Sequence, residues 1–365
     1  MAVNLRVVSE SARGRFRNAT VIFIKSLVWI RQLATRLAAA IVAAGALGCG
    51  TGGSESTVVV YTSVDQRFAE ALLARFTAET GIRVRALFDS EAGKTTGFLH
   101  RLRRERSRPR CDVWFSSEVF GTIELAREGL LAPYASPAAA DIPVEWKDPQ
   151  RRWTGLAARA RVAAFDPRRV DPSVVPRSWR AFAEPGWAAR TALANPLFGT
   201  TRGHVAAIFA YWGPEAARRF LQDLRVNGAV VADGNAHAVR LVASGAADIC
   251  WTDTDDVWAA QTRGEDLELV YPALDSGLPT VWIPCSVAIV ANGPHPGLAR
   301  RLTDFLVSAA VERALYESDS RNVPVRSAVR AELGVGGPAP QALDFERVAD
   351  ALPTADAAVR EILLD

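Results

Sequence analysis

The sequence has no unbroken apolar segment of about 20 residues, which is the length that a membrane-spanning helix requires. An apolar patch at residues 21–30 is interrupted by Lys25 and followed by Arg31. A second apolar run, from Leu37 to Leu47, is only as long as the core of a signal peptide. We therefore expect the N-terminal region to be a cleaved signal rather than a retained transmembrane anchor.

The sequence also lacks a strong excess of charge of one sign. It has 43 Lys and Arg residues against 40 Asp and Glu residues, a formal net charge of +3. The two signs are mixed along the chain except at residues 101–110, which are rich in arginine and are expected to form the exposed face of one helix. Nucleic-acid binding needs a concentrated basic face with interleaved aromatic residues, so we expect no nucleic-acid partner.

Catalytic motifs are missing as well. There is no Gly-x-Ser-x-Gly or His-Glu-x-x-His stretch, and the four histidines lack the spacing of metal ligands. The turn at residues 90–97 contains Gly93 and Lys94, but Phe88 stands where a Walker loop needs its first glycine. These absences favour a binding protein over an enzyme, and no cofactor is expected.

Cysteine is scarce, with four residues, and Cys49 stands at an informative place. The segment Ala46-Leu47-Gly48-Cys49 is similar to a bacterial lipobox, and a small, flexible stretch follows it. We expect a lipoprotein signal peptide at residues 1–48, lipid on Cys49 and a flexible linker at residues 49–56. The remaining cysteines would meet an oxidising compartment, in which Cys250 and Cys285 are a candidate disulfide.

From residue 57 onward, short apolar runs alternate with amphipathic segments, the pattern of an α/β protein with largely parallel strands. The expected strands are residues 58–61, 84–88, 113–115, 161–165, 191–194, 249–251 and 282–290. The expected helices are residues 65–79, a segment from about Thr95, a segment ending at about Glu128, residues 203–212, 214–226 and 236–244, and a late amphipathic segment around residues 298–306.

Two of the expected strand-to-helix turns carry hydroxyl groups and glycine. The first contains Lys94, Thr95 and Thr96, and the second contains Gly199, Thr200 and Thr201. Free N–H groups at the start of a helix attract an anion, although simple helix capping also accounts for threonines there. In open α/β sheets, ligands lie beyond the carboxyl ends of the strands, so we expect the two turns to share a cleft.

A third turn is acidic. Thr252, Asp253, Asp255 and Asp256 follow one expected strand and open a helix. Capping explains one or two aspartates, but three close carboxylates repel one another unless a cation, hydrogen-bond donors or proton uptake relieves them. Arg159 and Arg161 alternate along another strand and should face one side of it, either clamping an anion or forming a salt bridge.

Several segments together resemble the periplasmic ferric-ion-binding proteins, which are solute-binding proteins of ABC importers. The matching stretches are VVVYTS (58–63), FTAETGIRV (76–84), CDVWFSSE (111–118), GLLAPY (129–134), ARARV (158–162) and NVPVR (322–326). The resemblance implies a type II-like periplasmic-binding-protein fold with a ligand cleft between two α/β lobes. Lobe 1 would comprise residues 57–157 and 280–365, and lobe 2 residues 158–279.

The resemblance also implies site residues. The family's iron-ligating glutamate matches Glu118, its histidine falls at Asp65, and its paired tyrosines fall at Asp255 and Asp256. A ferric tyrosinate site is therefore absent, and these four carboxylates are the expected metal ligands. The family's anion-binding positions match Gly199, Thr200, Thr201 and Asn235.

The identity of the ligand stays open between several classes. Carboxylates suit a hard cation, so ferric ion or an iron chelate with an anion is one interpretation. A phosphonate, a phosphate ester, or a cationic or zwitterionic organic solute is another, because an ammonium could meet the aspartates while an acidic group meets Lys94 and the Gly-Thr-Thr turn. A secreted glycoside hydrolase that uses Glu118 with Asp255 or Asp256 is a weaker third.

The resulting hypothesis is a periplasmic, lipid-anchored, monomeric solute-binding protein. It would close around a small solute or metal ion and deliver it, unchanged, to an inner-membrane ABC permease. The lipid on Cys49 would hold it at a bacterial membrane.

Overall fold

The computed structural model describes residues 56–88 and 94–364. The predicted signal peptide, Cys49 and nearly all of the predicted linker lie outside these residues. Within the described part of the chain, no helix combines the length and the apolar character that crossing a membrane requires.

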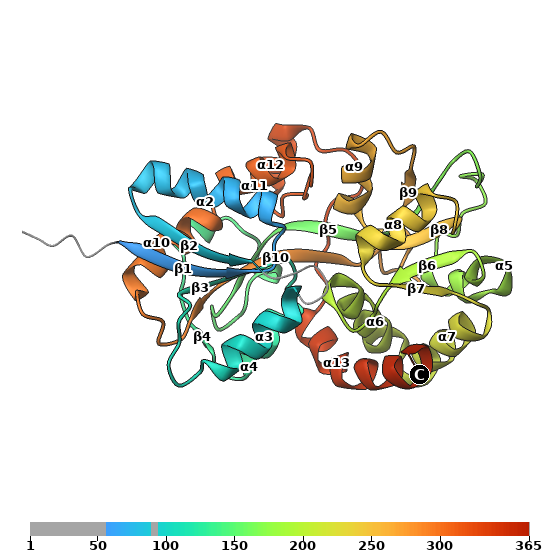
Figure 1. Cartoon of the computed structure of the whole chain (residues 1–365), viewed down its shortest axis with the longest axis horizontal. Helices are drawn as coiled ribbons and strands as arrows, with labels where there is room; N and C mark the ends of the chain where they lie inside the picture. Colours follow the sequence, from blue (N-terminus) through green and yellow to red (C-terminus); the bar gives the residue numbers. More distant parts are fainter. Residues whose placement is uncertain (1–55, 89–93, 365) are drawn as a thin grey trace, which may run out of the picture. The chain divides into compact units, whose positions relative to one another are not determined.

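Ten strands form one mixed sheet in this part of the chain, with the order β2-β1-β3-β10-β5-β8-β6-β7 (Figure 1). Strand β4 pairs with β10, and β9 pairs with β5. Strand β1 is parallel to β2 and β3, and β6 is parallel to β7 and β8. The strands are β1 (Thr57–Thr62), β2 (Arg83–Phe88), β3 (Val113–Ser116), β4 (Leu131–Ala132), β5 (Thr154–Phe165), β6 (Thr191–Ala194), β7 (Val230–Ala232), β8 (Ile249–Asp253), β9 (Glu268–Val270) and β10 (Trp282–Val290).

Strand β5 connects two parts of this sheet. Its first half pairs antiparallel with β10, and its second half pairs with β8 and β9. All twelve of its residues are buried. The strand is longer than the predicted 161–165. Arg159 and Arg161 interrupt the apolar pattern of the sequence, but each is paired with an aspartate and can therefore be buried within the strand. The residue boundaries of the two expected lobes stay a prediction.

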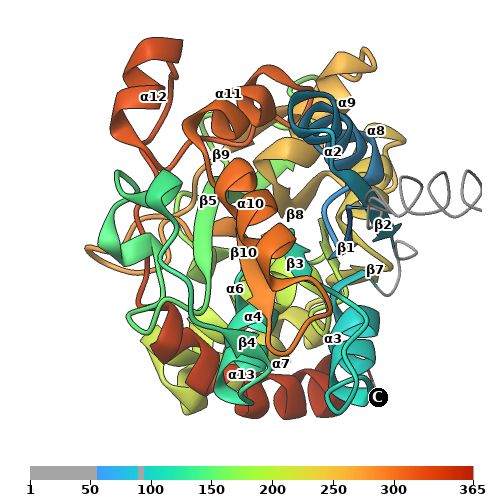
Figure 2. The same cartoon turned by 90° about the vertical axis from the view of Figure 1, so that its left-hand side faces the viewer.

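Helices cover both faces of the sheet (Figures 1 and 2). Helices α2, α10 and α11 lie on one side of β1–β3, and α3 and α4 lie on the other. Beside β6–β8, helices α8 and α9 lie on the side of α2, and α6 and α7 lie on the side of α3. The bounds are α2 (Gln66–Thr80), α3 (Lys94–Arg104), α4 (Phe120–Arg127), α5 (Pro185–Ala188), α6 (Gly199–Trp212), α7 (Pro214–Val226), α8 (Asn235–Ala243), α9 (Thr254–Thr262), α10 (Pro296–Leu306), α11 (Ala309–Glu317), α12 (Ser327–Leu333) and α13 (Phe345–Val359).

Helix α2 illustrates how the sequence forms these elements. Its buried residues Ala69, Leu72, Leu73 and Phe76 recur at three- and four-residue spacing, which places them on one face. Gly81 ends the helix with φ 69°, a left-handed conformation that glycine adopts without a steric penalty. Both the helix and its glycine stop were predicted, and both are confirmed.

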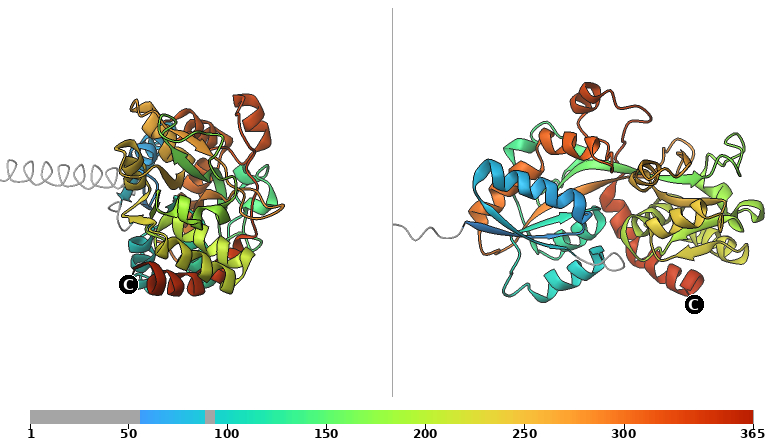
Figure 3. Two further views of the ribbon diagram at one scale, coloured as in Figure 1. Left: turned by 90° about the vertical axis from the view of Figure 1, so that its right-hand side faces the viewer. Right: turned by 45° about the horizontal axis from the view of Figure 1, so that its top comes forward.

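The structure differs from the expectations in three places. Helix α3 ends at Arg104, so the arginines from Arg106 to Arg110 lie in the loop that follows it and not on one helix face. Helix α6 begins at Gly199, four residues before the predicted start, because the Gly-Thr-Thr turn is itself the first helical turn. Helix α13 was not predicted, and it packs against α6 and α4 (Figure 3).

The candidate disulfide between Cys250 and Cys285 is not formed, and Cys111, Cys250 and Cys285 are all buried free thiols. Cys250 lies opposite Ala164 of β5, and Cys285 lies opposite Leu156 on the other side of that strand. Two strand spacings, about 10 Å, and eight residues along β5 therefore separate the two cysteines. A disulfide needs Cα atoms less than about 7 Å apart.

Candidate functional site

A pocket of about 130 Å³ lies where the carboxyl ends of strands from both parts of the sheet converge. A more open pocket of about 450 Å³ adjoins it and shares Ser63, Asp65, Ala236 and Asp256 with it. The smaller pocket is lined by Ser63, Asp65, Thr95, Ser117, Arg159, Ala194, Asn195, Phe198, Gly199, Thr200, Thr201, Asp233, Gly234, Asn235, Ala236, Asp253, Asp255 and Asp256. The two polar turns and the acidic turn of the sequence therefore meet in one place.

An acidic cluster forms one wall of the pocket. Asp253 ends β8, and Asp255 and Asp256 stand in the first turn of α9. Each offers a carboxylate oxygen, and these three oxygens lie within 4.8 Å of one another. Burial raises the pKa of Asp255 to about 6, with further contributions from the neighbouring charges of Asp253 and Asp65. Burial and the charge of Asp255 raise the pKa of Asp256 well above its ordinary value.

Two arginines of β5 partly compensate this negative charge. Arg159 Nη1 lies 2.9 Å from Asp255 Oδ2, and Arg161 Nη1 lies 2.7 Å from Asp253 Oδ1. The Arg159 side chain lines the pocket, whereas Arg161 is fully buried behind its wall. Two arginines for three close aspartates leave one carboxylate without a cationic partner, and either proton uptake or a cationic ligand would relieve its charge.

Hydroxyl and amide groups join the acidic cluster to two helix starts. Asn235 opens α8 and donates from Nδ2 to Asp253 Oδ2 at 2.8 Å. Thr200, in the first turn of α6, donates a hydrogen bond to the same carboxylate, and Thr201 donates to Asn235 Oδ1 at 3.2 Å. The first N–H groups of a helix have no partner within the helix, so the start of α6 presents donors to the pocket.

Several residues predicted for the site are placed beside the pocket rather than in it. Thr252 supports the acidic cluster, because its hydroxyl donates to Asp256 Oδ2 at 2.9 Å. Arg161 acts from behind the wall through Asp253, and Thr96 lies on α3 but not among the lining residues. Lys94 is the first residue of α3, and its side chain lies outside the described part of the structure.

Glu118 is likewise not among the residues that line the pocket. Its carboxylate accepts hydrogen bonds from the backbone N–H groups of Phe120 and Gly121 at the start of α4. Burial raises the pKa of Glu118 to about 7, although these backbone bonds and Arg202 oppose the shift. In this conformation Glu118 serves as a helix cap, and its role as a metal ligand stays a prediction.

The sequence reasoning did not select eight other lining residues: Ser63, Ser117, Ala194, Asn195, Phe198, Asp233, Gly234 and Ala236. Four of them share one local signal, which is that a polar residue follows directly after a strand. Ser63 follows β1, Ser117 follows β3, Asn195 follows β6 and Asp233 follows β7. That signal is weak in a single sequence, because such positions also hold ordinary caps and turns.

Comparison with known proteins assigns the chain to a protein family. Residues 57–318 match the model of the bacterial extracellular solute-binding protein family. Iron uptake protein A1 of Synechocystis sp. is 24% identical over 279 residues, which cover 74% of this chain and 76% of the relative. The major ferric iron-binding protein of Neisseria meningitidis serogroup B is 26% identical over 269 residues, which cover 71% of this chain and 78% of the relative.

Solved structures share the fold. Iron-bound HitA from Pseudomonas aeruginosa has a TM-score of 0.73 at 23% identity, and the match covers 84% of this chain and 99% of that one. The periplasmic binding protein AfuA from Actinobacillus pleuropneumoniae, solved with fructose-6-phosphate, has a TM-score of 0.72 at 16% identity, with 85% and 99% covered. These structures confirm the predicted type II periplasmic-binding-protein fold. The expectation of a binding protein is confirmed by the family match. The chain belongs to the bacterial extracellular solute-binding protein family.

Proposed function

We propose that this protein captures ferric ion, or a small ferric chelate, together with an anion and delivers it to an ABC permease. The proposal includes lipid attachment at Cys49, which would keep the protein at the outer surface of a bacterial membrane. Relatives named for iron uptake and for ferric-iron binding support the choice of metal. A relative from Sinorhizobium fredii named as a probable ABC transporter periplasmic-binding protein supports the permease partner.

The observation that carries the proposal is the convergence of Asp253, Asp255 and Asp256 at one pocket wall. Oxygen ligands of this kind suit a hard cation, and the described residues that line the pocket include no soft ligand. Asp65, three residues after β1, also lines the pocket and would complete the set of carboxylates. A trivalent cation would stabilise the ionised forms of Asp255 and Asp256, whose pKa values are raised in its absence.

The start of α6 is the proposed anion site. Gly199, Thr200 and Thr201 form its first turn beside the acidic cluster, with Asn235 at the start of α8 opposite. An anion there would meet two helix N-termini and could share the cation with the carboxylates. A ferric ion that enters with a small anionic chelator therefore suits the pocket, because the ion would meet the aspartates and the chelator would meet the start of α6.

A phosphorylated or zwitterionic organic solute is the second candidate. The adjoining pocket of about 450 Å³ offers room for an organic body, and a fold relative was solved with a sugar phosphate. In that arrangement Arg159 and the start of α6 would bind the acidic group, and the aspartates would bind hydroxyl or ammonium groups.

A thermal-shift and calorimetric titration of the full chain would test the proposal. Ferric citrate, Ga³⁺, divalent metals, inorganic phosphate, fructose 6-phosphate and an aminophosphonate would be the probes. At about 100 times its Kd, a ligand that binds only the folded state adds about 2.7 kcal/mol of stability. We expect ferric citrate to raise the Tm and the Asp255→Asn/Asp256→Asn variant to lose that shift.

The control removes two carboxylates elsewhere, with the substitutions Asp223→Asn on α7 and Asp266→Asn on the surface before β9. This variant should keep the full ferric shift, which shows that net charge alone is not the cause. A Tm that metals leave unmoved and that fructose 6-phosphate or the aminophosphonate raises would replace the metal by the second candidate.

A further inference from the structure

Exposed arginines gather at the end of the sheet where strand β1 begins. Arg104 ends α3, and Arg106, Arg108 and Arg110 lie in the loop between α3 and β3. All four side chains are exposed, and none has an ion-pair partner among the described residues. Arg85 is also exposed, but it lies on the edge strand β2, on the other side of β1 from β3. We refer to Arg104, Arg106, Arg108 and Arg110 as the basic pole.

The sheet register fixes the position of this pole. Val60 of β1 lies opposite Val113 of β3, and the Asp112 N–H group donates to the Val59 carbonyl at 2.9 Å, so the loop before β3 runs beside the first half of β1. Thr57, the first residue of β1, lies opposite Arg83, the first residue of β2. Figure 1 shows the start of β1 and the loop that follows α3 at the same end of the sheet. The basic pole therefore lies at the end of the sheet where β1 begins.

Neighbouring carboxylates do not neutralise the pole, because they already have other partners. Glu105 binds Arg101 and the Tyr61 hydroxyl. Glu124 and Glu128 both bind Arg103, and the buried Asp112 binds the Val59 N–H group and His295. The arginines of the pole thus keep their full charge toward solvent.

We propose that the basic pole binds the surface of a membrane that contains anionic phospholipid. This inference rests on the proposed lipid attachment at Cys49. Six residues lie between Cys49 and Ser56, and even a fully extended segment of these seven steps spans at most about 25 Å. A chain anchored there keeps the pole near the headgroups, where clustered arginines are attracted to anionic lipid.

The pole also sets the orientation of the ligand pocket. Strands β1 and β3 run from the pole to Ser63 and Ser117, which line the pocket at the other end of the same strands. Contact between the pole and the lipid surface directs that end away from the bilayer. The pocket then stays open to solute while the protein is held at the membrane.

The test uses the full, membrane-attached chain with a fluorescent label on the thiol introduced by Ser107→Cys. Ser107 is exposed between Arg106 and Arg108, whereas Cys111, Cys250 and Cys285 are buried and should not react. Energy transfer to a headgroup-labelled acceptor lipid reports the distance of the pole from the membrane. We expect greater transfer on vesicles of phosphatidylcholine mixed with phosphatidylglycerol than on phosphatidylcholine alone, and loss of the difference in about 1 M NaCl, where the Debye length is about 3 Å.

Two triple variants then distinguish an effect of the basic pole from an effect of the net charge of the protein. Arg106→Gln/Arg108→Gln/Arg110→Gln should abolish the difference between the two vesicle types. Arg219→Gln/Arg240→Gln/Arg360→Gln removes three exposed arginines from α7, α8 and the end of α13, and it should leave the difference intact. Equal transfer on both vesicle types, or equal losses in the two variants, would overturn the proposal.

Flotation of the same samples measures membrane attachment through the lipid, and ligand titration measures binding in the pocket. A loss of attachment or of ligand binding is therefore distinguished from a loss of contact between the basic pole and the lipid. Flotation with both vesicle types supports the lipid attachment on which the inference rests. A chain that floats with neither vesicle type would refute both the anchor and the pole.

Discussion

His204 is a buried imidazole held between aromatic rings. It lies on α6 with its ring 4.3 Å from Trp179 and 5.6 Å from Trp251, measured between centroids, and it is fully buried. Neither ring nitrogen has a hydrogen-bond partner among the described residues. Burial, assisted by the positive charge of Arg161, lowers the pKa of His204 well below its ordinary value. The folded protein therefore holds this imidazole neutral at a pH where the unfolded chain protonates it.

This difference predicts a pH dependence of stability. Because the folded pKa is the lower one, the contribution of His204 is present above pH about 6.5 and is lost as the pH falls below it. Urea unfolding should show that wild type loses about 1.4 kcal/mol more than His204→Leu between pH about 7.5 and about 5.5. His100→Leu, which removes an exposed histidine from α3, should behave like wild type. Parallel pH profiles for wild type and His204→Leu would refute the prediction.

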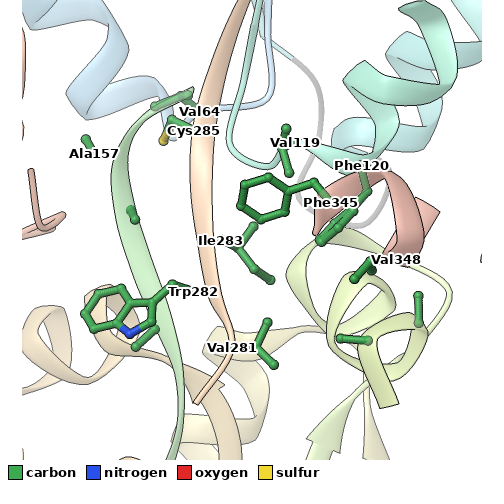
Figure 4. Close-up of a cluster of buried hydrophobic side chains, with 14 of the residues drawn as sticks. Val64, Val119, Phe120, Ala157, Val281, Trp282, Ile283, Cys285, Phe345 and Val348 are labelled. Carbon is green, nitrogen blue, oxygen red and sulfur yellow. The ribbon is translucent and has the colours of Figure 1, made fainter. Parts of the chain in front are cut away.

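At the scale of elements, the close approach of α4 and α6 positions the first turn of α6. A Cβ atom on Gly203 would overlap the Phe120 ring, so only glycine fits there without displacement of the ring. Phe120 in turn packs against Phe345 of α13, with 6.0 Å between ring centroids (Figure 4). Arg202 binds Glu124 of α4 and Asp356 of α13 at 2.7 and 2.8 Å. Three helices thus hold the Gly-Thr-Thr turn at the pocket.

Gly203→Ala should therefore destabilise the protein and weaken ligand binding together. Overpacking of this kind costs about 1–3 kcal/mol in the free energy of unfolding. Chemical denaturation and ligand titration of the same variant would measure the two effects. The added Phe120→Leu substitution should restore part of the loss, because a smaller side chain makes room for the new methyl group.

Gly186→Ala on α5 is the matched control. No atom lies within 4 Å of a Cβ atom at that position, so the change should be nearly neutral. Equal stability of Gly203→Ala and Gly186→Ala would contradict the packing argument.

At the scale of the whole molecule, the core around one continuous sheet buries three thiols. Cys111, Cys250 and Cys285 are each 0% exposed, and burial raises the pKa of all three. Since a thiolate is the reactive form, these cysteines should be inert in the folded protein. These three cysteines thus stay reduced, although the protein is proposed to reside in an oxidising compartment.

A thiol titration would check this expectation. The native, lipid-modified chain should not react with a disulfide reagent, and guanidinium should expose three reactive thiols in one transition that coincides with loss of tryptophan fluorescence. A gel shift on reduction, or fewer than three thiols after unfolding, would reveal a disulfide and contradict the structure.

Much of the fold could be predicted because its signals are local. The strand at residues 282–290 and the helix at 214–226 coincide with β10 and α7, since apolar periodicity and turn residues act over a few residues. Helix α13 escaped prediction because its residues pack against α6 and α4, which are distant in sequence. Thr95, Arg159 and Asp255 line one pocket, whereas Glu118 faces the start of α4.

Neighbouring residues along the chain specify the order of elements, the α/β class and the polar residues that follow the strands. Which of these residues meet depends on the tertiary structure, which pairs Asp253 with Arg161 and Thr200 with Asn235. The reason is physical. Local conformation depends on neighbours along the chain, but contact between distant residues depends on strand order and register, which the packing of the whole sheet fixes.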